Sequence, residues 1–251
     1  MSNWVTNEDG EIGQAGMENN ALIINEYFSL SGWTPNAIAA ILGNMQPESG
    51  INPARWENDN VGNLGGGFGI KYVSDDDPLT ASDYIKNVSE AVKMSAKKHN
   101  LACPFLVFEP GRSIVAPAGI TLYTVGGVKE IKDVRTYVSI DGGMGDNPRY
   151  ILYGSKYSAV LANKANEKAT EPVTIAGKCC ESGDLIAENI MMPKIEVGDT
   201  VAILATGAYN YSMASNYNRI PRPPIVAVSE NKKQVIVNRE TYDDIIKNDL
   251  L

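Results

Sequence analysis

Four short strings of the sequence contain residue types suited to holding a phosphate and a substrate. Residues 65–69 (Gly-Gly-Gly-Phe-Gly) precede a helical pattern, and glycine lets backbone N–H groups approach an anion closely. Residues 109–112 (Glu-Pro-Gly-Arg) end the apolar run that follows this helical pattern. Residues 180–184 (Cys-Glu-Ser-Gly-Asp) and 207–209 (Gly-Ala-Tyr) add a thiol, carboxyl groups and a phenol.

A repeated order of elements makes the first two strings more informative than either one alone. A single glycine cluster is weak evidence, because turns and helix caps also use glycine. Between residue 64 and about residue 119, however, a helical stretch at 81–99 leads into an apolar run at 101–108, which predicts a buried strand. Loop, helix, strand and loop in this order are typical of a parallel α/β fold. Two successive strand-end loops match the phosphate site of a (β/α)8 barrel.

The rest of the chain, from residue 120 onward, is predicted to be rich in β-structure. A glycine pair at Gly126 and Gly127 and a polar segment at 229–233 are expected to form hairpin turns. The predicted strands are 120–125, 135–140, 172–176, 200–204, 224–228 and 234–237.

Composition excludes several classes of function. A net charge of -8 and a pI of about 4.8 argue against a nucleic-acid or anionic-membrane partner. No apolar run is long enough to cross a bilayer, and no secretory signal is visible. The three cysteines include an adjacent pair and no spacing that suits zinc, so we expect reduced thiols, no metal site and a cytoplasmic location. The one histidine, His99, is expected to be solvated near a helix end.

From about residue 64 to residue 251 the sequence resembles the diaminopimelate decarboxylases. These belong to the alanine-racemase-like decarboxylases that use pyridoxal 5'-phosphate, and they consist of a (β/α)8 barrel followed by a β domain. The resemblance implies decarboxylation of meso-2,6-diaminopimelate to L-lysine and CO2, the last step of lysine biosynthesis, by a homodimer. The matching strings lie at residues 65–70, 109–112, 141–144, 146–149, 177–184, 207–209, 211–218 and 239–242.

The resemblance implies which residues bind the cofactor. Gly67 and the backbone of Gly111 and Arg112 would hold its phosphate. Glu109 would keep the pyridine nitrogen protonated, so that the ring can act as an electron sink. The full set of residues implied to bind cofactor is Gly67, Glu109, Pro110, Gly111, Arg112 and Tyr209.

The resemblance also implies a substrate site and a proton donor. Cys180 would protonate the carbanion left by loss of CO2, and Cys180 and Glu181 would reach the cofactor of the partner subunit. An arginine suits a substrate carboxylate because its planar guanidinium can bond in bidentate fashion. The implied substrate-binding residues are Arg112, Arg149, Tyr153, Glu181 and Tyr209. By residue type alone, the cysteine could equally be a small buried hydrophobe, the arginines salt-bridge partners and the tyrosines core residues.

Residues 19–58 resemble a different family, the phage-tail type lysozymes. The matching strings are residues 31–34, 41–49 and 51–53, with Trp56 after them. Glu48 takes the place of the general acid, a carboxyl at the close of an apolar helix where burial can raise its pKa. The alternative is that Glu48 is a solvated residue beyond a helix end.

The two resemblances meet at residues 65–69, which suggests a chimera made by recombination or by misassembly of sequence data. The cofactor family carries the aldehyde on a lysine of an early barrel strand, whereas the first lysine here is Lys71. A complete barrel needs roughly 250 residues, and the polar residues 58–63 make even the strand before the glycine cluster doubtful. We therefore expect a truncated relative that is inactive alone.

These inferences combine into one prediction of α+β, multi-domain architecture. We expect a helical lysozyme-like fragment at residues 1–62 and the last two βα units of a barrel at 63–119. A mainly antiparallel β domain of Greek-key barrel or sandwich type follows at 120–251. Two alternatives to a decarboxylase fragment stay open. One is a peptidoglycan muramidase acting through Glu48, and the other is a non-enzymatic β domain that dimerises or pairs with a full-length decarboxylase protomer.

Overall fold

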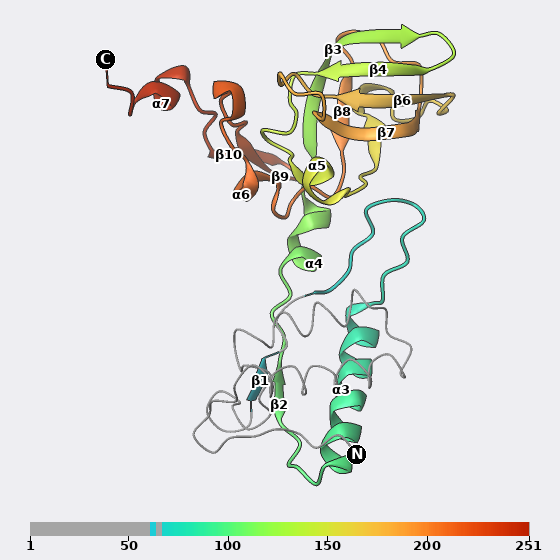
Figure 1. The fold of residues 1–251 in the computed structure, drawn as a ribbon, viewed down its shortest axis with the longest axis vertical. Coiled ribbons are helices and arrows are strands. Elements are labelled where there is room, and N and C mark those ends of the chain that lie inside the picture. The colour runs from blue at the N-terminus through green and yellow to red at the C-terminus, as the bar shows by residue number, and fades with distance from the viewer. Residues whose placement is uncertain (1–60, 64–66, 251) are drawn as a thin grey trace. The chain divides into compact units, whose positions relative to one another are not determined.

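The computed structural model describes residues 67–250 and the backbone of residues 61–63 (Figure 1). The described residues fall into two compact units. The first holds residues 61–63, 67–70 and 77–114, and the second holds residues 71–76 and 115–250. Among the described residues, no helix has the length and apolar character needed to cross a bilayer.

The first unit contains a strand, a long helix and a second strand. Strand β1 (Val61–Asn63) pairs in parallel with β2 (Phe105–Val107), and α3 (Ala81–Lys98) connects them. Helix α3 begins where the Thr80 hydroxyl accepts a 3.1 Å hydrogen bond from the backbone N–H of Asp83, as an N-cap should. The parallel pairing confirms the α/β character expected for this part of the chain.

Two details of the first unit differ from the sequence-based prediction. A strand does precede the glycine cluster, because Val61–Asn63, the last part of the stretch at 58–63, pairs with β2 through backbone groups, which any side chain permits. The buried strand predicted at 101–108 is also wrong in both its length and its burial. Only Phe105–Val107 is strand, and the Phe105 side chain is 77% exposed.

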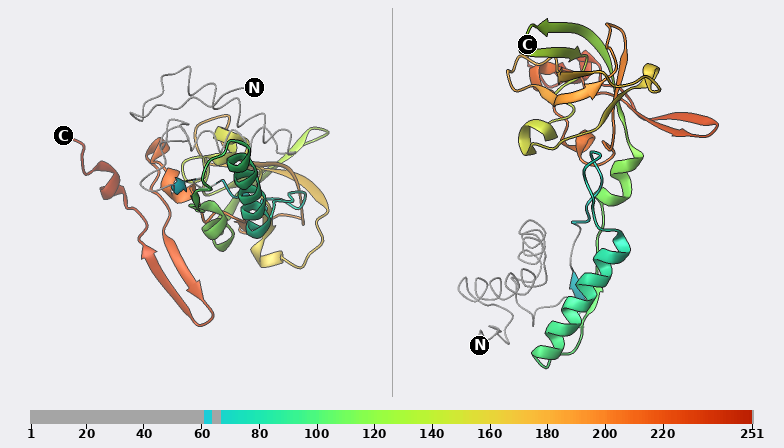
Figure 2. Two further views of the ribbon diagram at one scale, coloured as in Figure 1. Left: turned by 90° about the horizontal axis from the view of Figure 1, so that it is seen from below. Right: turned by 90° about the vertical axis from the view of Figure 1, so that its right-hand side faces the viewer.

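A curved six-stranded sheet forms the body of the second unit (Figures 1 and 2). Its order is β5-β8-β3-β4-β6-β7, and the edge strands β5 and β7 approach each other, so the sheet is nearly closed. Only the β4–β6 pair is parallel, which confirms a mainly antiparallel domain. The Greek-key connectivity stays a prediction. The strands are β3 (Thr121–Ile131), β4 (Arg135–Ile140), β5 (Ala159–Leu161), β6 (Glu171–Ala176), β7 (Leu185–Met192) and β8 (Thr200–Ile203).

Alternating side chains of these strands fill one core. In β3, Tyr123 and Val125 are buried whereas Leu122 is 56% exposed, as a strand with one covered face requires. The core cluster consists of Tyr123, Val125, Val138, Ile140, Tyr157, Leu161, Val173, Ile175, Ile186, Ala187, Met192, Ile195, Val201 and Ile203.

The predicted turn at Gly126 and Gly127 is wrong, because β3 continues through the pair. The register against β4 shifts between Val125 and Gly127, so the glycines lie at a β-bulge, the other common use of glycine in a strand. The chain turns instead at Ile131–Arg135, where Asp133 has a positive φ of 60°. Strands β5 and β7 were not predicted from the sequence.

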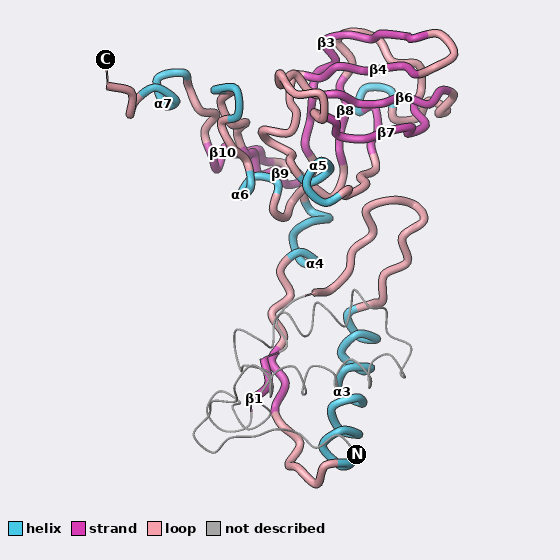
Figure 3. Tube along the Cα trace, viewed as in Figure 1, coloured by secondary structure: helices cyan, strands magenta, loops and turns pink. Residues whose placement is uncertain are grey.

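A second, two-stranded sheet follows the six-stranded one along the chain. Strands β9 (Ile225–Ser229) and β10 (Lys232–Val237) form an antiparallel hairpin, which confirms the turn predicted at 229–233 (Figure 3). Helix α7 (Tyr242–Ile246) comes after it, with a capping box between Thr241 and Asp244.

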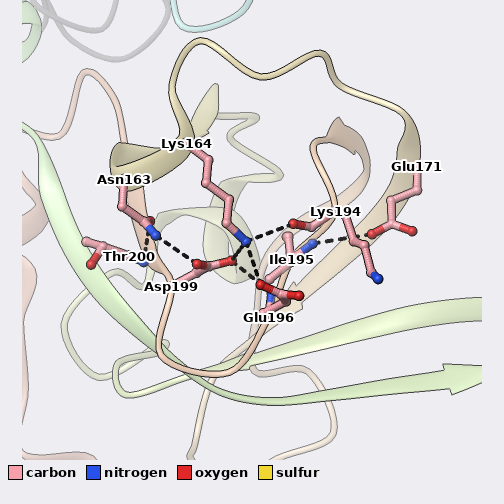
Figure 4. Close-up of polar contacts among 8 residues, drawn as sticks. All are labelled: Asn163, Lys164, Glu171, Lys194, Ile195, Glu196, Asp199 and Thr200. Atoms are coloured by element: carbon pink, nitrogen blue, oxygen red, sulfur yellow. Dashed lines mark hydrogen bonds and ion pairs between the residues drawn. The ribbon is translucent and has the colours of Figure 1, made fainter.

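A network of polar side chains ties η2 (Ala162–Lys164) to the connection between β7 and β8 (Figure 4). The Asp199 carboxylate accepts hydrogen bonds of 2.8 Å from Lys164 Nζ, from Asn163 Nδ2 and from the backbone N–H of Glu196. Although burial opposes it, the pKa of Asp199 is lowered, because Lys164, Asn163 and the Glu196 amide stabilise the charged form. The network fixes one end of the sheet.

Candidate functional site

The predicted site residues divide between the two units. The first unit holds the residues implied to bind the cofactor, Gly67, Glu109, Pro110, Gly111 and Arg112. The second holds Arg149, Tyr153, Cys180, Glu181 and Tyr209. Glu48 lies outside the described residues, so its role as a general acid stays a prediction.

In the first unit, the residue after Gly67 is buried against two aromatic rings. Phe68 is 5% exposed, and its ring centroid lies 4.5 Å from that of Tyr84 in α3 and 5.9 Å from that of Phe108 beyond β2. Gly67 itself is exposed and has a φ of 88°, a conformation that glycine adopts without steric cost. The backbone of Gly67 is therefore open to a ligand while its neighbour is held in the core.

The second strand-end loop leads into a short helix. Glu109 and Gly111 are exposed, and α4 (Arg112–Val115) begins directly after them. The backbone N–H of Ile114 donates a 3.1 Å hydrogen bond to the carbonyl of Gly111, which sets the first turn. An exposed glycine backbone in each loop fits an oxygen-rich anion such as a cofactor phosphate.

In the second unit, Arg149 is a buried cation close to two aromatic rings. It opens α5 (Arg149–Tyr153) and is 8% exposed. Its guanidinium carbon lies 5.3 Å from the ring centroid of Tyr153 and 5.4 Å from that of Tyr209, within cation–π range. The structure thus brings together three residues that the sequence placed 4 and 56 positions apart (153 − 149 and 209 − 153).

The hydrogen bonds of Arg149 leave its charge without a protein carboxylate in the part of the chain that is described. Its Nε donates a 3.0 Å hydrogen bond to the Tyr157 hydroxyl, and Nη1 lies 4.0 Å from the sulfur of Met213. No described Asp or Glu forms a salt bridge with Arg149. A buried charge is costly unless an opposite charge compensates it, so the arrangement suits an anionic group supplied by a ligand.

Three residues that the sequence did not single out hold α5 on the sheet. The Glu188 carboxylate on β7 accepts hydrogen bonds from Tyr150 Oη at 2.5 Å and from Arg135 Nη1 at 2.6 Å. The hydrogen bonds from Tyr150 and Arg135 lower the pKa of Glu188, whereas burial and Glu188 raise the pKa of Tyr150 to about 12. Tyr150 follows Arg149 directly, so this network fixes the helix that carries the buried guanidinium.

Tyr209 is held in an uncommon backbone conformation. Its φ is 70°, a region that bulky residues seldom adopt, and its side chain is 47% exposed. Before it, Gly207 meets the turn at η1 (Ala116–Ala118), and a Cβ added to Gly207 would lie 2.0 Å from the carbonyl oxygen of Val115. Strained residues of this kind cluster at functional sites, because the surrounding structure must impose the conformation.

Cys180 and Glu181 lie at the tip of an exposed loop before β7. The backbone N–H of Cys180 donates a 2.8 Å hydrogen bond to Asn218 Oδ1 from η3 (Tyr217–Arg219). The neighbouring Cys179 is half-buried, and burial together with the charge of Asp184 raises the pKa of its thiol to about 11. Both Cys180 and Glu181 are exposed and accessible to a ligand or a partner.

The α5 helix and the loop of Cys180 are neighbours. A Cβ placed on Gly183 would lie 2.8 Å from Ile151 Cδ1 of α5 and 3.9 Å from Glu181 Oε1. The backbone N–H of Lys178 also donates a 3.0 Å hydrogen bond to the carbonyl of Gly142, in the loop that leads to Arg149. A buried cation and an exposed thiol and carboxyl group are thus carried on adjoining segments.

Comparison with known proteins shows that the sequence is similar to pyridoxal-dependent decarboxylases. A sequence model of the family described as "Pyridoxal-dependent decarboxylase, C-terminal sheet domain" matches residues 17–207. The diaminopimelate decarboxylase of Bacillus subtilis is 53% identical over 188 residues, which make up 75% of this chain and 43% of that protein.

Solved structures agree with the sequence comparison. A diaminopimelate decarboxylase from M. jannaschii in complex with L-lysine has a TM-score of 0.68 at 38% identity and covers 76% of this chain and 43% of its own. One from Helicobacter pylori, also complexed with L-lysine, has a TM-score of 0.65 at 29% identity and covers 84% and 48%. The chain therefore spans less than half the length of these relatives.

The comparisons confirm the predicted resemblance for the C-terminal sheet domain. The family match begins at residue 17 and so includes residues 19–58, the stretch that we compared with phage-tail lysozymes. That comparison concerns residues outside the described part of the chain, and it stays a prediction, as does the proposed chimera.

Proposed function

The chain belongs to the family of pyridoxal-dependent decarboxylases, and we propose that it supplies the substrate-binding sheet domain of an enzyme that converts meso-2,6-diaminopimelate to L-lysine and CO2. The single observation that carries the proposal is the buried guanidinium of Arg149 within cation–π distance of Tyr153 and Tyr209. Two similar solved structures contain L-lysine, an amino acid with a carboxylate that this guanidinium suits.

The cofactor of the family is pyridoxal 5'-phosphate, and the exposed strand-end loops of the first unit fit its phosphate. We propose that Gly67, Pro110, Gly111 and Arg112 hold the phosphate end of the cofactor and that Glu109 faces the pyridine nitrogen. The exposed backbone of Gly67, at a φ of 88°, supports this assignment. When bound, the cofactor withdraws the electron pair left on the substrate carbon after CO2 departs.

The residues of the second unit would then bind the substrate and donate a proton to it. Arg149, with the rings of Tyr153 and Tyr209 beside it, orients a substrate carboxylate, and the exposed Glu181 contacts the remaining polar groups. Cys180 donates the proton from its Sγ to the carbon that has lost CO2. The exposed position of Cys180 at a loop tip suits presentation to a site completed by a partner subunit.

We propose further that turnover needs a second, complete protomer. Within these 251 residues no lysine precedes Lys71, so an early-strand lysine for the cofactor has no counterpart here. The domain limits of 1–62, 63–119 and 120–251, and the homodimer or mixed dimer, are part of this proposal. A muramidase acting through Glu48 has no support among the described residues and is not proposed.

The test measures L-lysine formed from meso-2,6-diaminopimelate in the presence of pyridoxal 5'-phosphate. The chain is assayed alone and mixed with the Bacillus subtilis relative whose own proton-donating cysteine is replaced by alanine. We expect L-lysine only from the mixture, and none when the added chain carries Cys180→Ala. A mixture that forms dimers without any turnover would refute the proposal and favour the non-enzymatic β domain. Turnover by the chain alone would refute the need for a partner.

A further inference from the structure

Asp184 is a buried carboxylate that accepts hydrogen bonds from two backbone N–H groups. It is 3% exposed, and its Oδ1 accepts a 2.6 Å hydrogen bond from the N–H of Met144. Its Oδ2 accepts a 2.7 Å hydrogen bond from the N–H of Cys179. Within the described ranges, no Lys or Arg forms a salt bridge with it. The two amide donors are 35 positions apart in the sequence (179 − 144), so one side chain connects two loops.

Two glycines make the space that the carboxylate occupies. A Cβ on Gly143 would lie 2.5 Å from Asp184 Oδ2, and a Cβ on Gly177 would lie 2.1 Å from the same atom. Neither distance is possible for real atoms, so any side chain at either position would displace the carboxylate. Gly143 comes from the loop that leads to Arg149, and Gly177 from the loop that leads to Cys180, which means that both loops are shaped around Asp184.

The loop between Gly177 and Asp184 is closed tightly by its own backbone. The N–H of Gly177 donates a 2.8 Å hydrogen bond to the carbonyl of Asp184, and the N–H of Asp184 donates one of 3.1 Å to the carbonyl of Glu181. Cys180 and Glu181 therefore lie at the tip of a turn whose two ends are joined. The Asp184 carboxylate accepts a hydrogen bond from the N–H of Cys179 inside this turn. Asn218 Oδ1, from outside the turn, accepts a 2.8 Å hydrogen bond from the N–H of Cys180.

We propose that Asp184 is a positioning residue that fixes the Cys180 and Glu181 loop relative to the Arg149 helix. It does so by binding both loops through charge-assisted hydrogen bonds, which are stronger than neutral ones. The inference rests on the proposed function only for the roles of Cys180 and Glu181. The geometric part, a loop held in place by Asp184, is measurable without any turnover.

The decisive variant is Asp184→Asn, which keeps the shape of the side chain. An amide has one oxygen, so its NH2 group must face one of the two backbone N–H groups and that hydrogen bond is lost. The matched control is Asp199→Asn. Asp199 is a carboxylate of the same unit with 5% exposure that also accepts a hydrogen bond from a backbone N–H, but its partners are Asn163, Lys164 and Glu196, which lie outside both loops.

The readouts are amide hydrogen exchange at Met144 and Cys179 and the rate of alkylation of Cys180 by iodoacetamide, resolved by mass spectrometry in a Cys103→Ser background. After correction for global stability, we expect Asp184→Asn to speed exchange at one or both amides by about tenfold or more, as loss of a charge-assisted hydrogen bond predicts. The alkylation rate at Cys180 should also change. Asp199→Asn should leave all three readouts at their original values.

A second variant keeps the test valid if Asp184→Asn does not fold. Gly177→Ala leaves the carboxylate in the chain but fills its space, and the same changes in exchange and alkylation are expected. In the mixed decarboxylation assay, each variant should lower kcat by roughly tenfold to a hundredfold, because misplacing a reacting group by about 1 Å has that effect. Unchanged loop readouts in both variants would overturn the proposal. Altered loop readouts together with an inactive original mixture would instead refute the proposed function alone.

Discussion

The Nε of Arg149 donates a 3.0 Å hydrogen bond to the hydroxyl of Tyr157, a side chain that is 1% exposed in the core of the sheet domain. The bond connects the candidate substrate site directly to the hydrophobic core, because Tyr157 packs edge-on against Tyr72 with ring centroids 5.1 Å apart. The orientation of the guanidinium is therefore set by the packing of the domain.

Replacing Tyr157 by phenylalanine should destabilise the domain. The change leaves the buried Nε of Arg149 without its acceptor, and we expect the free energy of unfolding to fall by about 1–3 kcal/mol in urea titrations. The control is Tyr153→Phe, which removes a hydroxyl from another tyrosine beside the same guanidinium but keeps the ring. Since Tyr153 is 64% exposed, Tyr153→Phe should change the free energy of unfolding by no more than about 0.5 kcal/mol. Equal losses in the two variants would contradict this account.

The strained backbone of Tyr209 predicts an unusual order of stability among its variants. At a φ of 70°, glycine has no steric cost whereas alanine does. Tyr209→Gly should therefore be more stable than Tyr209→Ala by about 1 kcal/mol, the reverse of the order in ordinary secondary structure. Thermal unfolding of the two variants measures the difference. If alanine proved the more stable of the two, the positive φ would not be present in solution.

The Lys164–Asp199 ion pair should couple more strongly than a pair at the surface. The two side chains are 17% and 7% exposed, and Asn163 and the Glu196 amide bond the same carboxylate (Figure 4). A double-mutant cycle with Lys164→Met and Asp199→Asn should give a coupling of about 1 kcal/mol or more in unfolding free energy.

The Arg219–Asp249 pair provides the comparison for this cycle. Its side chains are 63% and 39% exposed, so the equivalent cycle should give about 0.5 kcal/mol or less. A coupling as large as that of Lys164 and Asp199 would show that burial does not govern these pairs.

Glu240 should make the segment around β9 and β10 sensitive to acid. Hydrogen bonds from the Arg222 guanidinium and backbone lower its pKa from 4.5 to about 2. A carboxyl group whose folded pKa lies below its unfolded value contributes stability that is complete above the unfolded pKa. That contribution should be lost as the pH falls from about 5 to about 2.

A carbon-13 titration of the Glu240 carboxyl group measures this directly, and Arg222→Gln should return its pKa toward the usual range. Glu240→Gln should remove the associated slope of stability against pH. A titration midpoint of about 4.3 in the unaltered protein, the value of a free glutamate, would contradict the pairing of Glu240 with Arg222.

Strands rich in β-branched residues could be predicted from sequence, whereas irregular ones could not. Strands β4, β6 and β8 are of the first kind, and their predicted limits are within about two residues of the observed ones. Strand β7 contains Glu188 and Asn189, and the positive φ of 53° at Asn189 interrupts the alternation. The bulge at Gly126 and Gly127 has the same composition as a turn, so only the pairing with β4 distinguishes them.

The same limit applies to the site. Arg149, Tyr153, Cys180, Glu181 and Tyr209 were identified because their strings resemble a known family, not because of any spacing between them. Residues that position them, such as Asp184 and Glu188, have partners about 40 positions away, at Met144 and Tyr150. Such contacts form only when the sheet brings separate loops together, and a linear pattern does not contain them.

Titration of the chain with L-lysine and with 1,5-diaminopentane, the same diamine without a carboxylate, tests the central claim most directly. The signals to follow are the Nε–H of Arg149 and the ring protons of Tyr153 and Tyr209 in NMR spectra. We predict that L-lysine shifts all three sets, that 1,5-diaminopentane shifts none, and that Arg149→Gln abolishes the response of the rings. Equal responses to the two diamines, or an undiminished response in Arg149→Gln, would contradict a carboxylate site at Arg149.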